Sequence, residues 1–155
     1  GYQPMVARAA FEAGVDVILG HHAHVPKAVA VHGGKPCYYS LSNFIMSAPA
    51  ASAERLATFE QSYGTPLDPE YPHLPYGTDA KRSLIAKVTF GRSGVERSSF
   101  LPVLIDRQLR PEVLRASDSR FTDAVRYMEW ASEGLPHAFR VEGDEVVVTG
   151  EGDGI

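Results

Sequence analysis

The sequence has a single cysteine, little net charge and no long apolar run, and each absence excludes a class of protein. With one cysteine, Cys37, the 155-residue chain forms no internal disulfide, so its stability needs no oxidising compartment. A net charge of −4 is unlike the clustered basic footprint of nucleic-acid-binding proteins. We therefore expect no nucleic-acid partner. We also expect no transmembrane segment and no signal peptide in these residues, which leaves the compartment undetermined.

What remains is about one domain with the mixed pattern of an α/β fold. Apolar spacing and end signals predict helices over residues 3–13 and 119–132. A β-branched apolar run predicts a buried strand of the parallel type over residues 15–19. Strand pairs flanking glycine-containing turns predict three β-hairpins, over residues 28–41, 84–104 and 139–148.

Residues 47–81 differ in character, being rich in proline and tyrosine. Five prolines are spaced along this stretch, and proline removes a backbone donor and blocks helix. We predict a long loop with at most one helical turn, near residues 53–59. Loops of this length are typically lids, binding loops or inserts. Tyr63, Tyr71 and Tyr76 can line a binding face, and local packing is the alternative.

The order of elements is typical of the second half of an α/β sandwich. A buried strand such as residues 15–19 needs neighbours on both sides, and the sequence offers none upstream. We therefore expect residues 1–155 to be the single C-terminal portion of a longer domain, whose N-terminal half is absent from these residues.

Three of the six histidines fall within four positions, as His21, His22 and His24, directly after this strand. Strands of parallel sheets deliver their carboxyl ends to ligand-binding crevices. On an extended backbone, His22 and His24 point the same way. Neutral imidazole is a common ligand for zinc, iron and manganese. The pattern predicts that both bind metal, or that one binds metal and the other acts on substrate.

Two histidines do not complete a metal site, and the sequence offers no convincing carboxylate nearby. Asp16 lies at the wrong end of the strand. His32 is expected to be exposed, His73 lies in the proline-rich loop, and His137 is expected to be structural. Among polar residues, Asn43 can orient a histidine or contact substrate, or simply form a turn. Arg82, beside Lys81, can bind a carboxylate or phosphate, or belong to a solvated pair.

Two segments carry a resemblance to a known family. Residues 13–25, Ala-Gly-Val-Asp-Val-Ile-Leu-Gly-His-His-Ala-His-Val, resemble the Gly-Ala-Asp-x-x-x-Gly-His-His-Pro-His-Val segment of the CapA family of bacterial capsule or poly-γ-glutamate synthesis proteins. Residues 39–45, Tyr-Ser-Leu-Ser-Asn-Phe-Ile, resemble that family's Tyr-Ser-Leu-Gly-Asn-Phe segment. Ala23 stands where the family has proline, and Ser42 where it has glycine. Beyond residue 47 the resemblance is weak.

The CapA family is similar in fold to the calcineurin-like metallophosphoesterases. The resemblance implies the C-terminal part of a four-layer α/β/β/α sandwich with a two-metal site at the sheet edge. The last metal motif of that fold, Gly-His-x-His, overlays on His22 and His24, with His21 supporting them. The implied cofactors are one or two divalent ions of manganese, iron or zinc. The earlier Asp-x-His, Gly-Asp and Gly-Asn-His-Glu ligand segments do not occur in these residues.

Three functions remain open, since a fold hosts many activities. The first is a metal-dependent hydrolase acting on a phosphoester or a γ-glutamyl or peptide-type substrate, in polyglutamate or capsule metabolism. The second is a metal-independent acid/base peptide epimerase, which needs no cofactor. The third is a non-catalytic component of capsule polymer assembly. We predict the hydrolase, with the N-terminal half of the fold as its partner, His22 and His24 as catalytic metal ligands, and Asn43 and Arg82 as substrate contacts.

Overall fold

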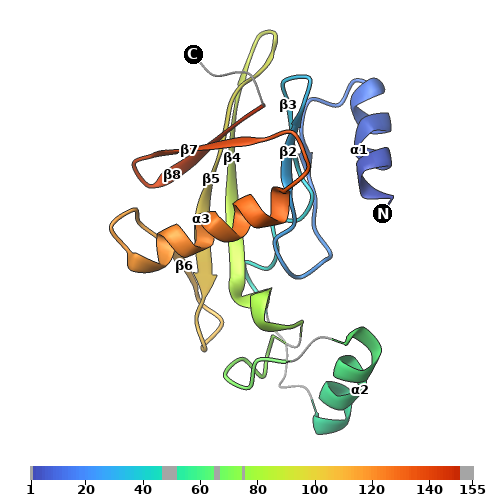
Figure 1. Ribbon diagram of the computed structural model, residues 1–155, viewed down its shortest axis with the longest axis vertical. Helices are drawn as coiled ribbons and strands as arrows, with labels where there is room; N and C mark the ends of the chain where they lie inside the picture. The colour runs from blue at the N-terminus through green and yellow to red at the C-terminus, as the bar shows by residue number, and fades with distance from the viewer. Residues whose placement is uncertain (1, 47–51, 65–66, 75, 151–155) are drawn as a thin grey trace.

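The computed structural model describes residues 2–46, 52–64, 67–74 and 76–150, and it has a mixed α/β architecture (Figure 1). The helices and strands, in chain order, are α1 (Gln3–Glu12), β1 (Ile18–Leu19), β2 (Val29–His32), β3 (Lys35–Tyr38), α2 (Ala53–Tyr63), a 3-10 turn η1 (Thr78–Lys81), β4 (Arg82–Gly91), β5 (Gly94–Ile105), β6 (Pro111–Val113), α3 (Ser119–Ser132), β7 (Ala138–Glu142) and β8 (Glu145–Thr149). The α/β class is therefore confirmed.

A three-stranded sheet carries the N-terminal part of the chain, in the order β1-β3-β2. Strands β2 and β3 form the first predicted hairpin, which turns at Gly33 and Gly34. Both glycines have positive φ, 58° and 79°, which a tight two-residue hairpin turn demands. Strand β1 joins the hairpin in parallel, with Ile18 opposite Cys37.

The prediction of a buried strand over residues 15–19 is wrong in extent and burial. Only Ile18 and Leu19 form β1, while Val15 is 39% and Leu19 47% exposed. The physical reason is that, within the described residues, β1 pairs with β3 on one side only. Its other edge has no neighbouring strand in the described part of the chain.

A five-stranded sheet carries the rest, in the order β4-β5-β8-β7 with β6 on β5. The predicted second and third hairpins are confirmed as β4–β5 and β7–β8. The short strand β6 was not predicted from the sequence. A single bridge between Ser42 and Ser83 ties the chain after β3 to the start of β4. This bridge places the segment that contains Ser42 and Asn43 beside the start of β4, where Arg82 lies.

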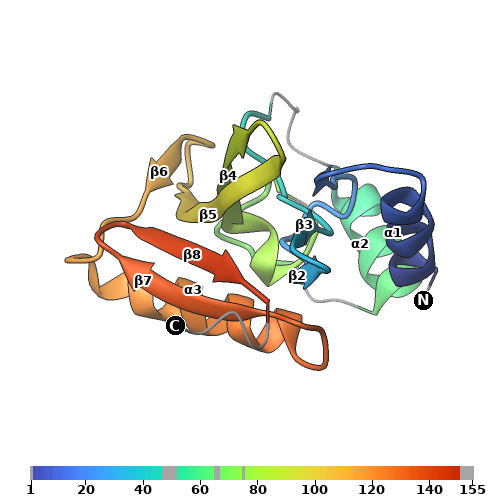
Figure 2. The same cartoon turned by 90° about the horizontal axis from the view of Figure 1, so that it is seen from above.

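Helix α3 has the bounds predicted from the sequence and lies across the larger sheet (Figures 1 and 2). The Asp118 side chain caps it by accepting from the Arg120 backbone N–H. Phe121 and Met128 enter a core that also contains Tyr38 of β3 and Phe100 of β5. The opposite face of the smaller sheet packs on α1, through Ala7. Predicted helix 3–13 is thus confirmed as α1, one residue shorter.

Helix α2 corrects the loop predicted over residues 47–81. Where a single turn was expected near 53–59, the helix runs from Ala53 to Tyr63. The prolines flank it at positions 49 and 66 rather than interrupt it, so eleven residues can form a regular helix. Residues 47–51, 65, 66 and 75 lie outside the described residues. In Figure 1, α2 extends from the end of the molecule, away from both sheets.

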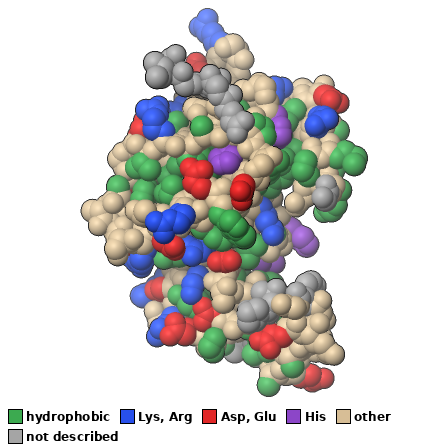
Figure 3. Space-filling model, in the orientation of Figure 1, with side chains coloured by type: hydrophobic (Ala, Val, Ile, Leu, Met, Phe, Trp, Pro, Cys, Tyr) green, Lys and Arg blue, Asp and Glu red, His purple; other side chains and the backbone are tan. Residues whose placement is uncertain are grey.

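The helices and the surface bear on two expectations, that these residues have no membrane span and no nucleic-acid partner. No helix among the described residues is long and apolar enough to cross a membrane. On the face shown in Figure 3, acidic and basic side chains are interspersed rather than segregated by sign. This face carries no basic stripe of the kind that binds nucleic acids.

The close approach of Gly20 to β3 makes a testable prediction about the fold. A Cβ atom at Gly20 would lie 2.4 Å from the Tyr39 carbonyl oxygen, so no side chain fits without moving backbone. We predict that Gly20→Ala lowers the free energy of unfolding by about 1–3 kcal/mol, measured by urea denaturation. Arg92→Ala, in the exposed β4–β5 turn, is the control. An unchanged midpoint for Gly20→Ala would contradict this packing.

Candidate functional site

The histidine segment leaves β1 as a bend rather than as extended chain. His22 and His24 both have positive φ, 81° and 58°, so the expected strand-like alternation of side chains is wrong. Left-handed backbone is uncommon in residues other than glycine and concentrates at functional sites. The bend nevertheless brings the two imidazoles together, with ring centres 6.5 Å apart and planes tilted by 41°. His22 is exposed and His24 half-buried.

Asn43 holds His24 through two hydrogen bonds. Its Nδ2 donates to the His24 carbonyl at 3.1 Å and to the Ala80 carbonyl at 3.4 Å, which fixes the orientation of the amide. Its Oδ1, which only accepts, then lies 2.6 Å from His24 Nδ1, so Nδ1 carries the proton. In the neutral ring, the lone pair is therefore on Nε2. Within the described residues Nε2 has no hydrogen-bond partner, so it can bind a metal or a proton.

Tyr76 covers one face of the His24 ring. The two rings are stacked, with centres 3.8 Å apart and planes within 7°. Phe59 of α2 meets Tyr76 edge-on at 6.0 Å, so the segment predicted as a loop does reach the site. A metal binds an imidazole nitrogen in the ring plane, so a stacked ring leaves Nε2 accessible. Tyr71 lies elsewhere, under the Lys81 ammonium, and the Tyr63 side chain is outside the described residues.

Ser42 is strained beside Asn43. Its φ is 72°, and its buried Oγ has no hydrogen-bond partner among the described residues. This is the position at which the CapA-like segment has glycine, the residue that adopts positive φ without steric cost. The turn that presents Asn43 is therefore kept, but with a residue that strains it.

His21 lies on a different side of the segment. With Phe44, Leu41 and residues of β4, it lines a largely apolar cavity of about 440 Å³. Neither His22 nor His24 lines this cavity. No hydrogen bond joins His21 to His22 or His24 in the described residues, so its supporting role stays a prediction.

Arg82, predicted to contact substrate, is engaged by two carboxylates. It donates to Asp79 at 3.1 Å and to Asp123 at 2.9 Å, and its guanidinium lies over the Tyr127 ring. Only 21% of its side chain is exposed. An anionic substrate would have to replace one of these partners. Lys81 is paired with Asp68 at 2.9 Å.

The remaining candidates have structural partners. His32, expected to be exposed, is half-buried with Nε2 3.2 Å from the Tyr39 hydroxyl, and burial together with nearby Arg8 lowers the pKa of His32. His137 has its ring nitrogens 2.8 Å from the Leu135 carbonyl and 3.2 Å from Glu129, as a structural role predicts. Cys37 is fully buried, and this burial raises the pKa of its thiol to about 11, which makes it an inert filler.

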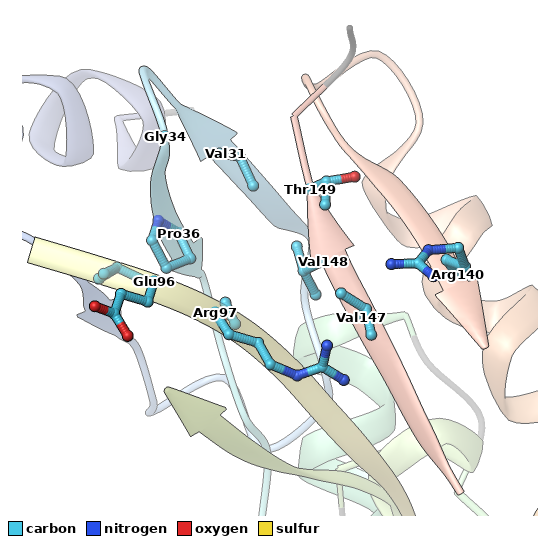
Figure 4. A pocket seen from close by; sticks show the side chains of 11 residues that line it. Val31, Gly34, Pro36, Glu96, Arg97, Arg140, Val147, Val148 and Thr149 are labelled. Carbon is cyan, nitrogen blue, oxygen red and sulfur yellow. The ribbon is translucent and has the colours of Figure 1, made fainter. Parts of the chain in front are cut away.

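A separate cavity of about 420 Å³ lies between the two sheets (Figure 4). Arg97 and Arg140 line it, but both are paired with Glu142. None of the histidines lines it. This cavity is therefore separate from the predicted site at His22 and His24.

No three histidine, cysteine or acidic side chains converge on a possible metal position within residues 2–46, 52–64, 67–74 and 76–150. A metal held by His22 and His24 would need further ligands from outside these residues. The contact that sequence reasoning missed is Tyr76 on His24, since nothing in a proline-rich stretch indicates which tyrosine returns to the site. The strain at Ser42, by contrast, was readable from the glycine that it replaces.

Residues 1–48 match the family model described as bacterial capsule synthesis protein PGA_cap. A stretch of 43 residues is 46% identical to the PGA biosynthesis protein CapA of Bacillus subtilis (strain 168), covering 28% of this chain and 11% of that protein. The resemblance to the CapA family is confirmed over this segment. The segment that matches PGA_cap contains His21, His22, His24, Ser42 and Asn43.

The CapA-like glycine position makes a prediction about stability. Ser42→Gly removes both the left-handed strain and a buried hydroxyl without a partner, so we expect the free energy of unfolding to rise by about 1 kcal/mol. Urea denaturation measures it, with Ser93→Gly in the exposed β4–β5 turn as the control. Equal or lower stability for Ser42→Gly would show that the turn is not strained.

Proposed function

We propose that this chain is part of a CapA-like metal-dependent hydrolase in which His22 and His24 bind divalent ions of manganese, iron or zinc. The observation that carries the proposal is the orientation of His24, whose Nδ1 is held by Asn43 and whose Nε2 faces no described partner. In metal sites, a hydrogen bond to one ring nitrogen typically fixes the other for the metal. The similarity to capsule and poly-γ-glutamate synthesis proteins supports a phosphoester or a γ-glutamyl or peptide-type substrate.

The spacing of the two imidazoles favours two ions over one. A metal lies roughly 3 Å from the centre of a ring that binds it, so two rings on one tetrahedral ion have centres about 5 Å apart. The observed 6.5 Å is longer than this. It fits better if each ring binds its own ion, in a pair of ions roughly 3.5–4 Å apart.

The remaining ligands would come from an N-terminal half of the same domain. Two observations support this part of the proposal: the unpaired β1 edge with its exposed Leu19, and the lack of a third ligand among the described residues. In this account residues 1–155 are the C-terminal portion of a four-layer α/β/β/α sandwich. Strand β1 would then continue into a larger sheet, which covers Leu19 and brings carboxylates to the histidines.

The residues of this chain have distinct tasks in such a site. Bound ions supply an activated water and stabilise negative charge on the attacked group. Asn43 keeps His24 in the tautomer with Nε2 available, and Tyr76 holds the ring plane. His22, exposed on the bend, either binds the second ion or donates a proton to the leaving group. His21 supports the segment from its other side, and Arg82 would contact substrate only after releasing a carboxylate.

An acid/base epimerase is the second candidate, because a free Nε2 on His24 can also accept a proton. The group that bonds to His24 Nδ1 is the Asn43 amide oxygen, and this favours the hydrolase. An amide oxygen orients the ring but, being uncharged, stabilises an imidazolium less than a carboxylate would. A role in polymer assembly without catalysis has no specific feature of the site in its favour.

Metal content tests the proposal directly. We predict that the full-length protein purifies with near-stoichiometric manganese, iron or zinc, and that the double variant His22→Ala, His24→Ala loses it, as measured by elemental analysis. The matched control removes the two histidines with structural partners, His32 and His137, and should keep the metal. Absence of metal from the unaltered protein, even after incubation with each ion, would overturn the hydrolase proposal.

Asn43 offers a finer test of how the site is organised. Asn43→Ala should weaken metal binding by about 10–100-fold, because His24 loses the bond that fixes its tautomer. Asn43→Asp keeps the acceptor for Nδ1 and should retain more affinity than Asn43→Ala, although it loses the donor to the two carbonyls. Equal affinities for the two variants, measured by competition with a chelator, would mean that Asn43 acts only on the turn.

A further inference from the structure

A cavity of about 640 Å³ has Tyr76, the residue that stacks on His24, among its lining residues. Its walls are the chain after the histidines at residues 25–28, the segment 76–79 that enters η1, and the C-terminal half of α3. The volume lies within the range of roughly 300–1,000 Å³ that is typical of small-molecule sites. Tyr76 thus forms a wall of this cavity while its ring stacks on His24.

Three aromatic side chains, Tyr76, Tyr127 and Trp130, are among the residues that line the cavity. Trp130 of α3 is 66% exposed, although large apolar side chains are normally buried. Tyr127 lies one turn earlier, with ring centres 5.6 Å apart, and its hydroxyl donates to the Pro26 carbonyl at 3.1 Å. Because this hydroxyl is satisfied, Tyr127 offers the cavity an oriented, mainly apolar wall. The exposed indole beside it extends that wall toward solvent.

Three charged residues line the cavity: Lys27, Asp79 and Glu133. Asp79 is paired with Arg82, which itself lies over the Tyr127 ring. Lys27 and Glu133 also line the cavity, and neither has an ion-pair partner among the described residues. Together they offer the cavity the donors of an ammonium group and the acceptors of a carboxylate, and their two charges cancel. A ligand with a single charge would meet one like and one opposite charge here, whereas hydroxyl groups can accept from Lys27 and donate to Glu133 at the same time.

We propose that this cavity binds a neutral sugar ring, which packs an apolar face against Trp130 and Tyr127 while its hydroxyls bond to Lys27 and Glu133. Such a ring would contact Tyr76, whose ring stacks on His24. Resting on the proposed function, we further infer that the sugar is part of the substrate that the enzyme hydrolyses. The binding itself needs neither metal nor turnover.

The chain contains one tryptophan, which makes occupancy of this cavity directly visible. Titration of the full-length protein with methyl glycosides of common hexoses and N-acetylhexosamines should give a saturable change in tryptophan fluorescence for at least one of them. Choline and triglutamate serve as the cationic and anionic probes. A response to either of these alone, or to no neutral sugar in the panel, overturns the proposal. A full-length protein with further tryptophans needs the same titration on a Trp130→Phe variant, whose response should be lost.

Variants locate the binding and separate it from the metal site. By calorimetry, Trp130→Ala and Glu133→Gln should each weaken sugar binding at least tenfold, while Tyr2→Ala, which removes an equally exposed aromatic elsewhere, should not. The double variant His22→Ala, His24→Ala should still bind sugar, and Trp130→Ala should still bind metal. Sugar binding that survives both cavity variants would overturn this site. If the unaltered protein binds sugar but no metal, only the proposed hydrolase is overturned.

Discussion

The amide of Asn43 is the contact on which the candidate site depends. From the chain that follows β3, this amide bonds to His24 and to the Ala80 carbonyl of η1, so one side chain joins three parts of the chain. Asn43 is only 6% exposed, and a buried amide of this kind is costly unless its donors and acceptors are paired. The same hydrogen bonds therefore satisfy the Asn43 amide and fix the His24 imidazole. The strained backbone at Ser42 and His24 is the conformational cost of this geometry.

The surrounding fold supplies the supports for that contact. Gly20 lets β1 lie directly against β3, so the histidine bend starts at a fixed point. The Ser42–Ser83 bridge fixes the turn before Asn43 to the larger sheet, and Tyr76 returns from the α2 segment onto His24. The same tyrosine forms a wall of the neighbouring cavity, so a ligand there and the imidazole share one aromatic ring.

Local patterns in the sequence predicted much of this arrangement. The hairpins, α1 and α3 followed from turn glycines, helix end signals and apolar spacing, all of which act over a few residues. The histidine cluster also stood out because three imidazoles after a strand rarely meet by chance. The predictions that failed depended on distant neighbours. Among the described residues, strand β1 has a partner strand on one side only, which leaves Leu19 exposed, and α2 forms because the neighbouring prolines lie outside it.

The side-chain partners of the site were beyond sequence reasoning for the same physical reason. Tyr76 and His24 are 52 positions apart, and no spacing rule reports a contact that tertiary packing creates. Arg82 carried the right chemistry for an anion, but its charge is taken up by Asp79 and Asp123, which only the folded chain brings together. Residue type thus indicated candidates, while hydrogen bonding decided which atom remains available.

Anomalous diffraction from manganese-soaked crystals of the full-length protein tests the central claim most directly. The account predicts an anomalous peak at bonding distance from Nε2 of His24, with Nδ1 still bonded to Asn43, and a second peak beside His22. Peaks elsewhere, or an Nε2 bonded to a protein group that the full-length fold supplies, would contradict it.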